Sequence, residues 1–177
     1  MPLTSMPTLK GNENAGEQSG TDFIELNDGR IVMGTITQFS LGDVLAKRRG
    51  SVLVDGKKYW YKEVAAAQYL NKYYRKDTKN GFDERIVKGK INVYRFLEIT
   101  NEDAKGDVVK SVFDWYFLQK GDKSPVVEFE IKVLEQMIAD HKPAVDEMKK
   151  YNALSKHDKA SKGDRYLNNV ISIYNNQ

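Results

Sequence analysis

The sequence predicts an α+β domain, with an N-terminal antiparallel β-sheet or small barrel of about six strands followed by two to three C-terminal helices. Two Asp-Gly pairs each lie between β-prone runs, which is typical of tight hairpins. After Pro125 the spacing of apolar residues changes from the period of a strand to that of a helix. We therefore expect a single domain over residues 22–177, β-rich in 22–127 and helical in 128–177.

The first 21 residues contain two prolines, three glycines and few large apolar side chains. Such a segment buries too little surface to offset the entropy of ordering, so we interpret residues 1–21 as a flexible leader. The chain has no cysteine, which excludes disulfides, thiolate catalysis and Cys-ligated zinc. No apolar run approaches the ~18 residues of a membrane-spanning helix.

The first expected hairpin joins residues 23–26 to residues 30–36 through Asp28-Gly29. The second joins residues 51–54 to residues 57–61 through Asp55-Gly56. Both turn positions favour a positive φ, which Asp and Gly adopt at low cost.

Three further strands are expected in the middle of the chain. Residues 64–68 fit a strand or a short helix, because alanines make the pattern ambiguous. Residues 86–99 form the best long strand, with Ile91 and Val93 on one face. Residues 108–118 are apolar on both faces, which predicts a central or sandwiched strand.

Helical spacing begins with Ile131, Leu134 and Ile138, and Pro143 is suited to the first turn of a second helix. Residues 152–163 are polar, and we expect little order there. Asp164 is the expected N-cap of a last helix. Its apolar stripe comprises Leu167, Val170, Ile171 and Tyr174.

The sequence shows no catalytic or metal-binding motif. His141 and His157 lie in polar surroundings and are expected to be exposed, and Glu128 and Glu130 flank Phe129 like the wet side of a strand. The glycines form no phosphate-binding loop. We therefore assign no catalytic residue, no metal ligand and no cofactor.

Aromatic and basic residues alternate over residues 57–76, and such mixtures can stack on bases or on sugar rings. Packing of the tyrosines into a core is the competing interpretation. The candidate ligand-binding residues are Tyr59, Trp60, Tyr61, Tyr73, Tyr74 and Arg75. A second basic stretch, Lys47-Arg48-Arg49, fits either a phosphate contact or a solvated loop.

Residues 23–177 resemble a group of uncharacterised exported proteins of Bacteroidetes-type bacteria. The resemblance rests on FIELNDG at 23–29 with Gly34, VDGKKY at 54–59, RIVKGKINVYR at 85–95 and VISIYN at 170–175. It implies an envelope or secreted domain whose signal peptide has been removed, located in the periplasm, at the outer membrane or outside the cell. It implies no chemistry.

A shorter segment, LNDGRIVMGTI at 26–36, is similar to the first motif of Sm-like RNA-binding proteins, in which a bent strand with a glycine builds a small barrel. Residues 86–91 echo the second motif. The polar residues that would contact a base after the first motif are replaced by FSLG at 39–42.

The leading hypothesis is a non-enzymatic envelope or secreted protein that binds a partner protein, a glycan or another extended ligand through its sheet. A nucleic-acid-binding Sm-like module is the alternative. It ranks lower because 28 basic and 25 acidic residues nearly cancel. An enzyme whose site is not visible in one sequence is the third hypothesis.

Overall fold

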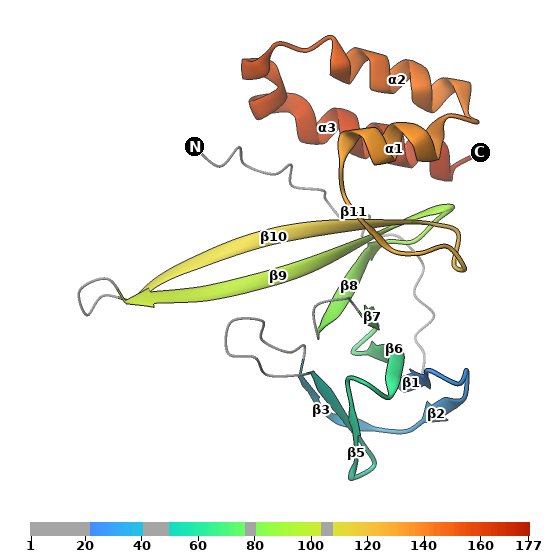
Figure 1. Cartoon of the computed structure of the whole chain (residues 1–177), viewed down its shortest axis with the longest axis vertical. Helices are drawn as coiled ribbons and strands as arrows, with labels where there is room; N and C mark the ends of the chain where they lie inside the picture. Colours follow the sequence, from blue (N-terminus) through green and yellow to red (C-terminus); the bar gives the residue numbers. More distant parts are fainter. Residues whose placement is uncertain (1–21, 41–49, 77–80, 104–107) are drawn as a thin grey trace. The chain divides into compact units, whose positions relative to one another are not determined.

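The computed structural model describes residues 22–40, 50–76, 81–103 and 108–177, and only the backbone in 97–103 and 108–114. The expected leader and the Lys47-Arg48-Arg49 stretch lie outside the described residues. The fold is α+β, as predicted, with β-strands first and three helices at the C-terminal end (Figure 1). The expected number of about six strands was too low, because the described chain forms eleven. In part this is because single expected strands are divided by turns and bends.

The strands form two sheets. An eight-stranded sheet has the order β11-β10-β9-β8-β7-β6-β1-β2, and a three-stranded sheet has the order β3-β4-β5. The strands are β1 (Phe23–Leu26), β2 (Ile31–Met33), β3 (Ile36–Ser40), β4 (Ser51–Val54), β5 (Lys57–Trp60), β6 (Val64–Tyr69), β7 (Lys72–Lys76), β8 (Phe82–Val87), β9 (Ile91–Asp103), β10 (Val108–Lys120) and β11 (Val127–Glu128).

The chain divides into two compact units. Unit 1 contains Ile86–Val93 and Asp114–Gln177, and unit 2 contains Tyr94–Phe113 and the described residues that precede Ile86. Each unit has its own buried apolar cluster.

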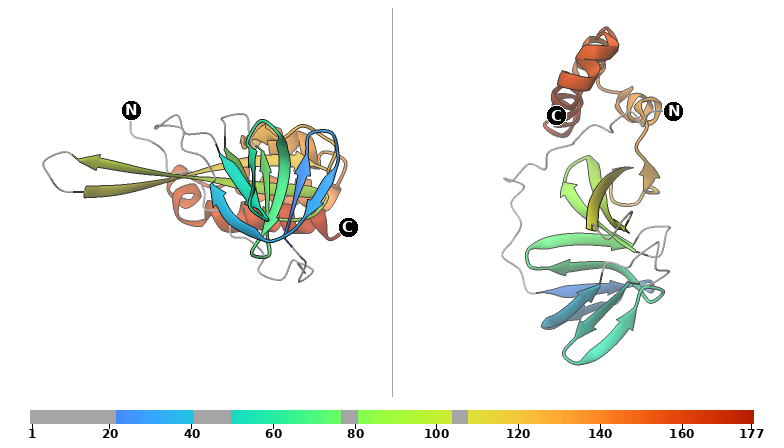
Figure 2. Two further views of the ribbon diagram at one scale, coloured as in Figure 1. Left: turned by 90° about the horizontal axis from the view of Figure 1, so that it is seen from below. Right: turned by 90° about the vertical axis from the view of Figure 1, so that its left-hand side faces the viewer.

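Both Asp-Gly hairpins form in unit 2, but the expected positive φ at both turn residues is found only at Asp55-Gly56; in the first turn Gly29 has it and Asp28 does not. β1 pairs antiparallel with β2, and β4 pairs antiparallel with β5. The ambiguous residues 64–68 belong to strand β6, which pairs with β1 on one side and β7 on the other. The core of unit 2 combines residues of both sheets, including Ile24 and Val64 from the large sheet and Val52 and Val54 from the small one. Figure 2 shows the ribbon of these strands from two further sides.

The expected strand over residues 30–36 is divided at Gly34. β2 ends at Met33 in the large sheet, and β3 begins at Ile36 in the small sheet. Asp55 fixes the bend, because its Oδ1 accepts a hydrogen bond of 2.9 Å from the Thr35 N–H. A Cβ on Gly34 would lie 2.2 Å from Asp55 Oδ2, so any other residue here would force the Asp55 side chain to shift.

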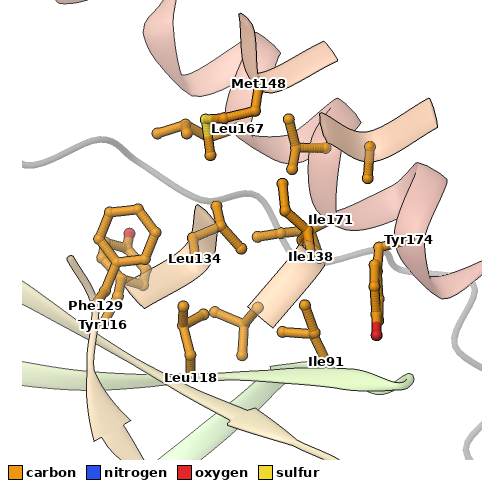
Figure 3. Packing of buried hydrophobic residues seen from close by; sticks show 13 residues of the cluster. Ile91, Tyr116, Leu118, Phe129, Leu134, Ile138, Met148, Leu167, Ile171 and Tyr174 are labelled. Carbon is orange, nitrogen blue, oxygen red and sulfur yellow. The ribbon is translucent and has the colours of Figure 1, made fainter. Parts of the chain in front are cut away.

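Unit 1 packs the helices α1 (Ile131–Ile138), α2 (Lys142–Asn152) and α3 (Lys156–Asn175) against strand residues. Figure 3 shows Leu118 and Ile91 from the strands meeting Leu134 and Ile138 from α1. Pro143 lies in the first turn of α2, as predicted. The predicted stripe of α3 is buried at Leu167, Val170, Ile171 and Tyr174.

Two expectations for unit 1 were wrong. Residues 152–163 are not left unordered, because α3 begins at Lys156, and its N-cap is Ser155 rather than Asp164. Ser155 Oγ accepts a hydrogen bond of 3.1 Å from the Asp158 N–H. Asp164 therefore lies within the helix, whose N-cap is nine residues earlier in the chain than expected.

The long strand expected over residues 86–99 is interrupted at residues 88–90, which separate β8 from β9. Gly89 accommodates the side chain of Asn175 at this break, since a Cβ there would lie 2.3 Å from Asn175 Cγ. Beside the break, fully buried Asn92 donates a hydrogen bond of 3.0 Å to Asp122 in the turn after β10.

Candidate functional site

The six residues of the expected ligand platform do not share one surface. Tyr59, Tyr61 and Tyr74 are each less than a tenth exposed and belong to the core of unit 2. Phe39 packs between these strands, with its ring centroid 4.6 Å from that of Tyr74. Packing therefore accounts for these three tyrosines, whose rings are not presented to a ligand.

Tyr73 and Arg75 lie on the opposite side of strand β7 from Tyr74, because successive side chains of a strand alternate. We call this side of the large sheet in unit 2 the second face. The pairing of β2, β1, β6, β7 and β8 defines two rows of side chains across it. One row is Met33, Phe23, Gln68 and Tyr73, and the other is Ile31, Glu25, Ala66, Arg75 and Asp83.

Exposure along the second face rises toward β2. Ala66 and Asp83 are 2% exposed, and Phe23, Glu25 and Tyr73 are half-buried. Ile31 and Met33, at the β2 end, are 61% and 55% exposed. Large apolar side chains are thus presented to solvent at the end of the sheet.

Charged and aromatic groups meet where β7 and β8 adjoin on the second face. The Arg85 guanidinium lies 4.0 Å from the centroid of the Tyr73 ring, within the range of a cation–π contact. Burial raises the pKa of the Tyr73 hydroxyl, and nearby Tyr94 and Glu25 act in the same direction.

Strand β2 is the last strand in the order of the large sheet, and in the described chain it pairs only with β1. Two hydrogen bonds show which residues of β2 direct their backbone groups toward β1. The Leu26 N–H donates to the Arg30 carbonyl, and the Gly34 N–H donates to the Asp22 carbonyl. Val32 accordingly directs its N–H and C=O toward β1. The backbone groups of Ile31 and Met33 point away from β1, toward the free edge.

Trp60, the remaining aromatic of the platform, is 46% exposed. It lies on the outer side of the small sheet, because Tyr59 beside it faces the core. Lys58 shares that side, and its Nζ lies 3.9 Å from the centroid of the Trp60 ring. The turn after Trp60 is fixed by Glu63, whose Oε2 accepts a hydrogen bond from the Trp60 N–H.

A polar cluster in unit 1 joins the end of β10 to the helices. The Tyr174 hydroxyl donates to Asp140 at 3.0 Å, and Lys120 Nζ lies 2.9 Å from Asp140 Oδ2. These bonds hold the pKa of Asp140 below its ordinary value, the bond from Lys120 contributing most. His141 packs edge-on against Tyr174, so it is half-buried rather than exposed as expected, whereas His157 is exposed.

Among the described residues, no group of three or more His, Cys, Asp or Glu side chains is placed to hold a metal ion. In the same part of the chain, none of the helices combines the length and the apolar character that crossing a membrane requires.

Comparison with protein-family models, with curated proteins and with solved structures found no match to this chain.

The free edge of β2 was missed in the sequence. Ile31, Val32 and Met33 are all apolar, so the pattern gave no sign of which of them are exposed. The bend at Gly34 was the available signal, since a strand that changes sheets ends its pairing early.

Proposed function

We propose that this chain is a non-enzymatic binding protein that captures an extended segment of a partner protein at the edge of β2. The proposal is carried by one observation: within the described part of the chain, the backbone groups of Ile31 and Met33 that point away from β1 have no strand partner, and the side chains of both residues are exposed. Strand addition of this kind takes affinity from main-chain hydrogen bonds and specificity from alternate side chains.

The edge is short, at three residues, but it lacks the charged and proline residues with which proteins commonly protect an exposed strand. Such edges carry lysine, proline or an inward-pointing charge to prevent pairing with other chains. Residues 31–33 contain none of these. An apolar edge without these residues is prone to pair with a strand from another chain.

The second face gives the captured segment its side-chain preference. A strand added beside β2 places every second residue on the side of Ile31 and Met33. These positions adjoin Phe23, which pairs with Met33. We expect the captured segment to carry apolar residues at alternate positions.

The test uses a display library of extended peptides and the full chain as bait. Met33→Pro removes one edge N–H but leaves the hydrogen bonds to β1, because Arg30, Val32 and Gly34 make them. We expect peptides with alternating apolar residues to be enriched and Met33→Pro to weaken their binding at least tenfold. The matched control is Leu70→Ala, which removes an exposed side chain from the β6–β7 turn and should bind as the wild type does. Equal binding by wild type and Met33→Pro contradicts the proposal.

We also propose that the protein works in the cell envelope or outside the cell, as the resemblance to exported proteins implies. The support is the composition of residues 1–21, which suits a tether. Fractionation of the native host, with mass spectrometry of the protein's N-terminus, tests this. A processed protein outside the cytoplasm is expected, and an unprocessed cytosolic protein would bring the Sm-like alternative forward.

A further inference from the structure

Three lysines lie on or next to the end of β5, where the ring of Trp60 is exposed. Lys58 lies against the ring, and Lys62 follows in the next turn. Lys76 reaches the same turn from β7, with its Nζ 4.9 Å from the centroid of Tyr61. We call Lys58, Trp60, Lys62 and Lys76 the Trp60 patch.

Asn27 links the backbone of Lys62 to the side chain of Lys76. Asn27 Nδ2 donates to the carbonyl of Lys62, and Asn27 Oδ1 accepts from Lys76 Nζ at 3.5 Å. Asn27 therefore keeps the β7 lysine beside the turn that follows Trp60. All of these residues belong to unit 2.

The positive charge of the patch is not neutralised within the described chain. None of its three lysines forms an ion pair with a described carboxylate, whereas Lys72 on the same strand as Lys76 pairs with Glu84 at 2.9 Å. The carboxylate of the adjacent Glu63 accepts a hydrogen bond from the Trp60 N–H. The patch thus combines one exposed indole with a net excess of ammonium groups.

From this arrangement we propose that the Trp60 patch binds the surface of a membrane that contains anionic phospholipids. An indole is suited to the boundary between headgroups and acyl chains, because its body is apolar and its N–H is polar. Lysines beside it are attracted to the negative headgroups. Lys58 can follow the ring to this boundary because it already lies against it.

Two observations favour a lipid surface over single-stranded nucleic acid. Successive bases need several exposed rings, but Tyr59 and Tyr61 on either side of Trp60 are buried. The cations are lysines, which act as hydrated point charges, rather than arginines with planar forks for bidentate phosphate recognition. The inference goes beyond the proposed function, since the patch does not include the β2 edge.

The experiment is co-sedimentation of the full chain with phosphatidylcholine vesicles, with and without phosphatidylglycerol. Binding is expected only to the anionic vesicles, with a decrease as salt is added and a blue shift of tryptophan emission. Lys58→Gln, Lys62→Gln and Lys76→Gln together should weaken binding ~100-fold, at about fivefold per lysine. Trp60→Phe should abolish most of the blue shift while the chain stays folded by circular dichroism.

The matched control replaces three helix lysines of unit 1 by Gln: Lys142, Lys149 and Lys162. Each of them lies in an ion pair on its own helix, and the triple change removes the same net charge. The control should retain vesicle binding. The inference is overturned if the control loses as much affinity as the patch variant, if anionic vesicles do not bind, or if a single-stranded oligonucleotide binds at the patch more tightly than the vesicles do.

Discussion

Asn175, the last residue of α3, forms two hydrogen bonds with the backbone of Ile91, the first residue of β9. Its Oδ1 accepts from the Ile91 N–H at 2.8 Å, and its Nδ2 donates to the Ile91 carbonyl at 3.0 Å. The side-chain amide thus pairs with the strand as another backbone would. Gly89 leaves the space that this contact requires. The C-terminal end of unit 1 is therefore attached to the sheet by a specific polar contact as well as by apolar packing.

Asn175→Ala should destabilise unit 1 by about 1–3 kcal/mol, because it leaves both Ile91 backbone groups without this partner. Denaturant unfolding followed by far-ultraviolet circular dichroism measures the change. The matched control is Asn176→Ala, next in the chain and exposed, which should change stability by less than ~0.5 kcal/mol. Equal effects of the two substitutions would show that the Asn175 contact contributes little.

Gly34→Ala should destabilise unit 2 by about 1–3 kcal/mol, because the added methyl group overlaps Asp55 Oδ2 and lies 2.8 Å from Val54 Cγ1. Combining it with Asp55→Ala should recover little, since the Val54 contact remains and the bond to Thr35 is lost. Thermal unfolding of both variants tests this, with Thr37→Ala on exposed β3 surface as control. Full recovery in the double variant would contradict a tight approach at both residues.

Local signals in the sequence predicted most individual elements. Asp28-Gly29 and Asp55-Gly56 predicted the two hairpins because turn geometry depends on the turn residues themselves. Apolar spacing predicted the three helices because burial of Leu134 and Leu167 follows the helical period. These features need no knowledge of distant contacts.

Features that depend on contacts between distant residues were missed. The break at residues 88–90 accommodates Asn175, which is far away in the sequence. The polar start of α3 was missed for a different reason: it has no apolar stripe, and its signal is a local one, the cap that Ser155 provides to the Asp158 N–H. The expected aromatic platform does not form one surface. Side chains alternate along β7, and Tyr59 of β5 packs into the core, so the members point in different directions. The order of strands in the sheets, which decides which side is buried, is not encoded locally.

Tyr74 and Trp60 should differ in their contributions to stability. Tyr74→Ala should cost about 3–5 kcal/mol, because it removes a buried ring packed against Phe39. Trp60→Ala should cost less than ~1 kcal/mol, because nearly half of that side chain is already in solvent. Urea unfolding of the two variants under one condition measures the difference. A large loss for Trp60→Ala would place the ring in the core and weaken the case for the Trp60 patch.

Asp140 should make the stability of unit 1 depend on pH in the acid range. Its folded-state pKa is lowered, mainly by Lys120, so its contribution is fully present above the unfolded pKa of about 3.9 and is lost as pH falls through the folded value. The stability difference between wild type and Asp140→Asn should be constant near neutral pH and should shrink below about pH 4. Urea titrations across this range measure it. A difference that grows on acidification would have the wrong sign for a lowered pKa.

Ser155 should contribute more to α3 than Asp164 does, although Asp164 has the residue type and sequence position that favour a cap. Ser155→Ala removes the acceptor for the Asp158 N–H and should cost about 1 kcal/mol. Ser155→Asp should retain most of the stability, because a carboxylate can also accept this bond. Asp164→Ala should cost less than Ser155→Ala, because alanine is favoured within a helix. Denaturant unfolding ranks the three variants, and hydrogen exchange at residues 156–160 shows whether the first turn frays. If Asp164→Ala proved the more damaging change, with those amides still protected in Ser155→Ala, the helix would depend on Asp164 rather than on its cap.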